Sequence, residues 1–102
     1  MKKVLFVCSG GMSSAIVEKA LDKEAKSSEI ELYTSAVGSG EAEEVIKNND
    51  WNVILVAPQV KHRFKIFEKA AEENEIPIFL IKPQDYSPLG GKNILHLVNH
   101  VK

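Results

Sequence analysis

A strand, loop and helix pattern near the start of the sequence constrains the fold of this 102-residue chain more than any other feature. A continuous apolar run, Val-Leu-Phe-Val, leads into Cys8, and two glycines and several small polar residues follow. An apolar run without alternation is typical of a strand buried on both faces of a parallel sheet. Gly10 and Gly11 permit a tight loop, and Ser13 or Ser14 can cap the helix that follows. We expect this helix to turn four side chains inward: Ile16, Val17, Ala20 and Leu21.

Three more strand and helix units are predicted after the first. The predicted strands are Val4–Val7, Ile30–Val37, Trp51–Ala57 and Ile76–Ile81. The later helices are predicted to run from Ser39 to Asn48, from about Val60 to Asn74, and from Leu89 to Val101. We therefore expect a single domain, residues 1–102, of the α/β class. It would contain a four-stranded parallel sheet with helices on both faces, in the flavodoxin-like strand order 2-1-3-4.

Three segments are expected to meet at one edge of this sheet. In the flavodoxin-like order the first strand lies beside the third, and ligands bind outside the carboxyl ends of the strands, where the strand order reverses. The segments at these ends are Cys8–Ser14, Pro58–His62 and Lys82–Tyr86. A binding or catalytic site should be built from them.

The position of Cys8 suggests a reactive thiol. Backbone N–H groups of a glycine-containing loop, together with the N-terminus of the following helix, stabilise a thiolate, which is the nucleophilic form of cysteine. The same donors could hold a phosphoryl group on the sulfur. The competing interpretation is that Cys8 is only a small buried apolar side chain, a common fate of cysteine in folded proteins.

Composition excludes several classes of function. The chain has 13 basic and 14 acidic side chains, and a formal net charge of −1 gives no electrostatic case for nucleic-acid binding. A single cysteine and the lack of a long apolar run predict a cytoplasmic protein that reaches a membrane only through a partner. The basic cluster from Lys61 to Lys65 is either solvated surface or a contact for an acidic or phosphorylated partner.

The chain resembles the enzyme IIB component of the lactose/cellobiose class of the sugar phosphotransferase system. The resemblance is carried by VCSGGMSSA, by the turn APQV and by the Asp-Tyr pair of the last loop. It implies that Cys8 accepts a phosphoryl group from a phosphohistidine of enzyme IIA and passes it to a sugar held by the membrane permease, enzyme IIC. It also implies a phosphate-binding loop made of Ser9, Gly10, Gly11, Met12, Ser13, Ser14 and Ala15.

Four other residues are candidates for contacts at this edge: Pro58, Gln59, His62 and Tyr86. His62 and Tyr86 are equally compatible with surface and packing roles. His96 and His100 are spaced four residues apart on the last predicted helix, but no third ligand accompanies them, so we expect no metal site. No cofactor is expected either.

Two other functions are compatible with the sequence. A low-molecular-weight phosphatase or arsenate reductase also has a cysteine at the end of a strand, and Asp85 could act as its general acid. Such an enzyme needs an arginine six residues after the cysteine, where this chain has Ser14. A IIB-like regulatory module without catalysis, or a small flavodoxin-like ligand binder, is the other alternative, although no aromatic pair is placed to hold a flavin. The sequence does not specify the sugar or the oligomeric state.

Overall fold

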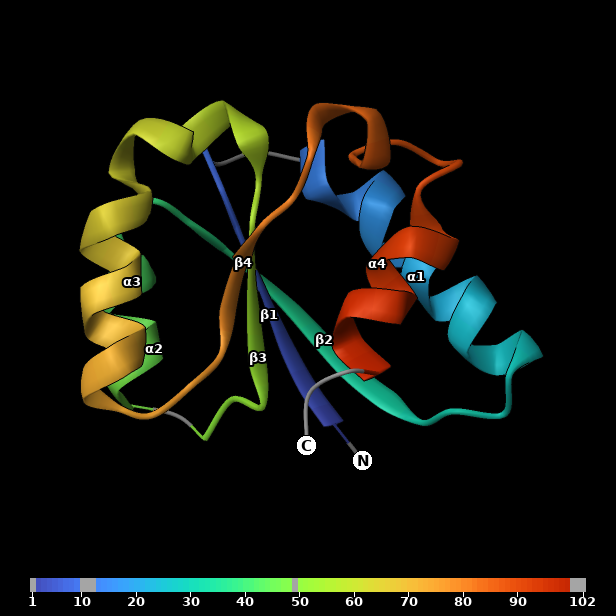
Figure 1. Cartoon of the computed structure of the whole chain (residues 1–102), viewed down its shortest axis with the longest axis horizontal. Coiled ribbons are helices and arrows are strands. Elements are labelled where there is room, and N and C mark those ends of the chain that lie inside the picture. Colours follow the sequence, from blue (N-terminus) through green and yellow to red (C-terminus); the bar gives the residue numbers. More distant parts are fainter. Residues whose placement is uncertain (1, 10–12, 49, 100–102) are drawn as a thin grey trace.

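Four parallel strands form one sheet in the order β2-β1-β3-β4 in the computed structural model, which describes residues 2–9, 13–48 and 50–99 (Figure 1). The strands are β1 (Lys2–Cys8), β2 (Leu32–Gly38), β3 (Val53–Val56) and β4 (Ile78–Leu80). The central strand β1 pairs with β2 over its whole length, so that Cys8 lies opposite Gly38. On its other side β1 pairs with β3 as far as Val7 and Val56. The predicted sheet and its strand order are confirmed.

Helices cover both faces of the sheet and create two apolar cores (Figure 1). The helices are α1 (Ser13–Ser27), α2 (Ala42–Asn48), α3 (Phe64–Glu73) and α4 (Gly91–Asn99). Leu5 and Val7 of β1 pack on the side of α2 and α3, whereas Val4 and Phe6 pack on the side of α1 and α4. Because both faces are covered, β1 and β3 are apolar without interruption.

Two 3-10 turns follow the strands on one side of the sheet. They are η1 (Pro58–Arg63) after β3 and η2 (Pro83–Asp85) after β4. Each begins with a proline that follows an extended residue, and this agrees with the backbone restriction that proline imposes on its predecessor. The predicted helix from Val60 is therefore wrong at its start. Val60 has a non-helical backbone (φ −116°, ψ 24°), and α3 begins only at Phe64.

Two predicted burials are wrong. Ile16 is 55% exposed, because α1 turns Val17, Leu21 and Ala25 toward the sheet with the i, i+4, i+8 spacing of one helix face. Leu89 is 94% exposed and precedes α4, which begins at Gly91. The predicted last residue of that helix, Val101, lies outside the described residues.

Close backbone approaches explain the pair of glycines before and at the start of α4. A Cβ atom on Gly90 would overlap the backbone of Asp85, and one on Gly91 would overlap the backbone of Ala20 in α1. Glycine alone lets these segments come so close. The contact fixes the start of α4 against α1, near the end of the sheet where β1 finishes.

Candidate active site

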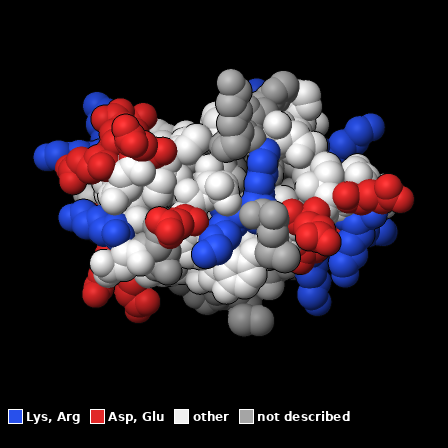
Figure 2. Space-filling view, turned by 90° about the horizontal axis from the view of Figure 1, so that it is seen from below, with Lys and Arg blue, Asp and Glu red and all other residues white. Residues whose placement is uncertain are grey.

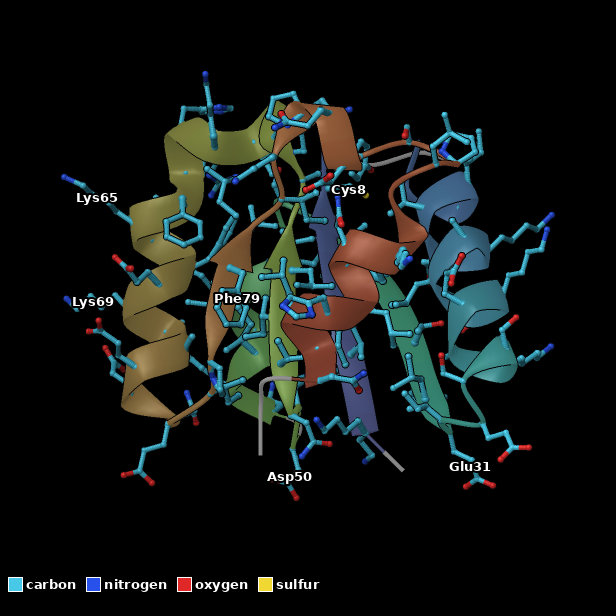
Figure 3. All side chains as sticks on the ribbon, turned by 45° about the vertical axis from the view of Figure 1, so that its right-hand side comes forward. Cys8, Glu31, Asp50, Lys65, Lys69 and Phe79 are labelled. Carbon is cyan, nitrogen blue, oxygen red and sulfur yellow. The ribbon has the colours of Figure 1, made fainter. Side chains whose placement is uncertain are left out.

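Cys8 is the last residue of β1 and lies between the ends of the two neighbouring strands. Its side chain is 2% exposed. On one side it is opposite Gly38, and on the other side the carbonyl of Val7 accepts a hydrogen bond from the amide of Ala57 (2.8 Å). Figure 3 shows Cys8 at one end of the sheet, with Asp50 at the opposite end. The cysteine is thus at the carboxyl end of the central strand, where α/β proteins place their sites.

The thiol of Cys8 is held against the sheet. Its Sγ lies 3.7 Å from the carbonyl oxygen of Val37 in β2, with the S–H group as donor. The side chain also belongs to the same core as Ala57 and Val60, which follow β3. These contacts fix the sulfur at the end of the sheet.

The helix that follows Cys8 begins close by in sequence. α1 starts at Ser13 and runs for 15 residues, and the positive end of its dipole lies at the same end of the sheet as Cys8 (Figure 1). An N-terminus in this position favours a negative group beside the sulfur.

The predicted phosphate loop falls partly outside the described residues. Gly10, Gly11 and Met12 are not among them, nor are the side chains of Ser13 and Ser14. At its two ends, Ser9 is exposed and Ala15 is half-buried. Phosphate binding by this loop therefore stays a prediction.

The turn η1 supplies the second predicted segment. Val60 anchors it in the core that also contains Cys8, while Gln59 and His62 are exposed and Pro58 is half-buried. Gln59 and His62 are therefore accessible to a partner that approaches this end of the sheet. Their contacts with such a partner remain predicted.

Tyr86 occupies the third predicted segment, just after η2. It is half-buried and packs against both cores, so its ring lies where the two layers of the molecule meet. Its amide hydrogen-bonds to the carbonyls of Lys82 (3.2 Å) and Pro83 (3.3 Å). This placement agrees with packing at the sheet end and leaves a catalytic contribution as a prediction.

Sequence reasoning missed two exposed apolar side chains near this end, Ile16 and Leu89. Leu89 stands between Pro88 and Gly90, and such a context is typical of a loop, so its exposure had a signal in the sequence. Ile16 had none, because both it and its buried neighbour Val17 are β-branched and apolar.

The described residues contain no group of three side chains suited to hold a metal ion, and His100 lies outside them. Within the same part of the chain, none of the helices combines the length and the apolar character needed to cross a membrane.

Comparison with known proteins identifies the family. Residues 3–97 match the model of the lactose/cellobiose-specific IIB subunit of the phosphotransferase system (PTS). The chain belongs to this family. The resemblance carried by the cysteine loop is thereby confirmed, and the chain is a PTS IIB component of the lactose/cellobiose type.

Two relatives illustrate the range of the family. The oligo-beta-mannoside-specific EIIB component of Bacillus subtilis is 30% identical over 92 residues, which cover 90% of this chain and 87% of the relative. The lactose-specific EIICB component of Staphylococcus epidermidis is 36% identical over 62 residues, or 61% of this chain, but only 10% of that longer protein.

Solved structures of IIB proteins share the fold. The cellobiose-specific IIB component from Borrelia burgdorferi has a TM-score of 0.75 and 30% identity, with 97% of this chain and 89% of that chain covered. The lactose-specific IIB domain from Streptococcus pneumoniae has a TM-score of 0.79 with 97% and 96% covered; at 24% identity it supports the fold alone.

Proposed function

We propose that this IIB component is a phosphocarrier in which Cys8 accepts a phosphoryl group from a phosphohistidine of enzyme IIA and passes it to a sugar held by enzyme IIC. The observation that carries the proposal is the position of Cys8, at the carboxyl end of the central strand and before the N-terminus of α1, in a chain of the IIB family. This position brings a nucleophile and a site of positive potential together.

The proposed reaction has two balanced steps. In the first, the sulfur of Cys8 attacks phosphorus, the S–P bond forms and the P–N bond of phosphohistidine breaks. The bonding electron pair leaves with the imidazole nitrogen, and the thiol proton passes to that imidazole. In the second, a sugar hydroxyl oxygen attacks phosphorus, the S–P bond breaks, and the proton of the hydroxyl ends on the thiolate. Both steps are in-line phosphoryl transfers.

Backbone donors suffice for the carrier role that we propose. The amides from Ser9 to Ala15 would hold the phosphoryl oxygens, with the α1 dipole adding attraction. No arginine occurs in this stretch, and Ser14 stands where a phosphatase of the low-molecular-weight type needs one. A carrier must keep its phosphoryl group until the acceptor arrives, so the lack of a bidentate arginine clamp favours transfer over hydrolysis.

A membrane permease is the acceptor in this proposal. The name of the lactose-specific EIICB relative joins a IIC part and a IIB part in one protein. We therefore place the chain in the cytoplasm, with membrane contact through the permease. The relatives are named for lactose, cellobiose and oligo-beta-mannoside, so the proposed acceptors are β-linked sugars of this kind.

The test is intact-mass and peptide analysis after incubation with phosphoenolpyruvate, enzyme I, HPr and a IIA protein of the lactose/cellobiose class. We expect one added phosphoryl group, located on Cys8. The Cys8→Ser variant should remain unlabelled while its circular dichroism matches that of the wild type. A label on His62, or equal labelling of Cys8→Ser, would contradict the proposal, as would the absence of label with IIA proteins that phosphorylate their own IIB partners.

A further inference from the structure

Two large apolar side chains are exposed beside the start of α1. Leu89 is 94% exposed and Ile16 is 55% exposed. Ile16 lies one helical turn before Ala20, whose backbone meets Gly91 of α4. Leu89 comes two residues before that same glycine. Both side chains therefore border the α1 and α4 side of the sheet end that carries Cys8, and we call them the apolar flank.

A basic surface lies on the other side of Cys8. Lys61, His62 and Arg63 occupy η1, and Lys61 and His62 are exposed. No acidic residue occurs in the sequence between Asp50 and Glu68. The guanidinium of Arg63 lies 5.7 Å from the centre of the Phe67 ring, which limits its freedom. We call these three residues the basic flank.

The opposite end of the molecule has a different charge distribution. Seen from below, basic and acidic side chains are interspersed (Figure 2). A shallow cavity there is lined by both signs of charge, with Lys3 and Lys47 beside Asp50 and Glu75. The uninterrupted positive segment is thus at the end that carries Cys8.

We propose that the two flanks form one docking face for the protein that donates the phosphoryl group. The donor would place an apolar patch against Leu89 and Ile16, and acidic side chains against Lys61 and Arg63. Cys8, between the flanks, would then face the phosphorylated side chain. This inference rests on the proposed function and adds to it the chemistry of the partner surface.

Burial of the thiol supports a fitted partner. Cys8 is 2% exposed, so a phosphorylated side chain reaches the sulfur only if its protein covers the surrounding surface. The exposed groups on that surface must then be matched. A leucine exposed to 94% gains most from being covered, since nearly all of its apolar area is in water before contact.

The donor, rather than the sugar permease, is the occupant that the charges favour. A donor that diffuses gains from electrostatic steering, which raises association rates by about 10- to 1,000-fold. A permease joined to its IIB part, as the name of the EIICB relative indicates, is held close by the covalent link and has less need of steering.

The test of the basic flank compares two pairs of charge reversals. Lys61→Glu/Arg63→Glu changes the flank, whereas Lys65→Glu/Lys69→Glu makes the same change in net charge. Lys65 and Lys69 lie on α3 and point away from Cys8 (Figure 3). We expect kcat/KM for transfer from phosphorylated IIA to fall by about 10-fold or more in the first pair and by less than about 2-fold in the second.

The nature of the loss separates docking from chemistry. The rate at saturating donor should stay close to that of the wild type, while KM rises and the dependence of kcat/KM on salt becomes weaker or changes sign. Lys61→Glu alone, which leaves Arg63 on Phe67, should show the same trend and guards against a folding defect. A loss confined to the rate at saturation would overturn the docking role.

The apolar flank has its own matched pair. Leu89→Ser should raise KM several-fold without changing the unfolding midpoint, because the side chain is exposed. Ile66→Ser is the control, since Ile66 is 42% exposed in the groove between α2 and α3. Equal KM values for wild type and Leu89→Ser would overturn this half of the docking face.

Other occupants give other results. Normal transfer from IIA with impaired transfer to sugar in permease-containing membranes would assign the face to the permease and overturn the donor assignment. Binding to vesicles of phosphatidylcholine with 30% phosphatidylserine, lost in Lys61→Glu/Arg63→Glu while transfer from IIA is unchanged, would assign it to a lipid surface instead. Failure of wild-type Cys8 to be phosphorylated would overturn the proposed function itself.

Discussion

Gly91 is the residue whose identity the fold restricts most clearly. It opens α4 with its Cα against the backbone of Ala20, and a Cβ atom there would overlap that backbone. Backbone cannot rotate away as a flexible side chain can, so a larger residue must displace the helix. The contact therefore couples one residue to the packing of two helices.

We predict that Gly91→Ala lowers the free energy of unfolding by about 1–3 kcal/mol, the usual cost of forcing a group into a closely packed contact. Urea unfolding followed by circular dichroism measures it. Gly40→Ala is the matched control, because nothing lies within 4 Å of the Cβ position at Gly40. Its effect should stay within about 0.5 kcal/mol. Equal stabilities for the two variants would contradict the close contact.

Single residues also show where sequence reasoning succeeds and where it stops. The Gly90-Gly91 pair predicted a close backbone approach, but not that its partners are Asp85 and Ala20. The choice between Ile16 and Val17 as the inward side chain was missed. Two adjacent apolar residues fit the periodic pattern equally well, and only the packing of α1 on the sheet separates them.

At the scale of elements, two helices end in the same unusual way. The amide of Ile30 bonds to the carbonyl of Ala25 (2.8 Å) and that of Glu29 to Lys26 (3.1 Å), which is the Schellman pattern at the end of α1. The same pattern ends α3, where Ile76 bonds to Ala71 (2.8 Å). The residue that needs a left-handed backbone is a glutamate in both cases.

These glutamates hide the caps from sequence analysis. Glu29 has φ 57° and Glu75 has φ 56°, a conformation for which glycine is the usual choice. Polar residues near Ser28 and Asn74 still predicted roughly where each helix ends. The capping geometry itself had no signal, because glycine or asparagine is absent from the position that carries it.

We predict that Glu29→Gly and Glu75→Gly each raise the free energy of unfolding by about 0.5–1 kcal/mol. The left-handed conformation costs a residue with a Cβ about 1–2 kcal/mol, and the greater freedom of glycine in the unfolded chain offsets about 0.4–1 kcal/mol of that gain. Thermal and urea unfolding measure the change. Glu75→Ala removes the same charge but keeps the Cβ, so it should give no gain. If it stabilises as much as Glu75→Gly, charge and not conformation is responsible.

At the scale of the whole molecule, the sequence was most informative about layers. Two uninterrupted apolar runs predicted central strands covered on both faces, and β1 and β3 are those strands. The connections were less predictable. The Pro-Gln pairs after β3 and β4 indicated breaks but not the 3-10 turns that follow, because a proline at the start of a turn is compatible with several backbone paths. The docking face depends on such connections.

The last prediction concerns how the two cores share stability. Ile46 lies in the core on the side of α2 and α3, and Ile94 lies in the core on the side of α1 and α4, with the sheet between them. Ile46→Val and Ile94→Val should each lower the free energy of unfolding by about 0.5–1.5 kcal/mol. Since the two side chains belong to separate clusters, the double variant should lose the sum within about 0.5 kcal/mol.

Because one sheet joins both cores, we also expect them to unfold together. Trp51 is the only tryptophan and packs on the core that contains Ile46, so its fluorescence reports that side, while circular dichroism reports all helices. The two signals should give one urea midpoint in every variant, including Ile94→Val, whose change lies on the far side of the sheet. A shift of the circular dichroism midpoint without a shift in fluorescence would mean that the helical layers unfold independently.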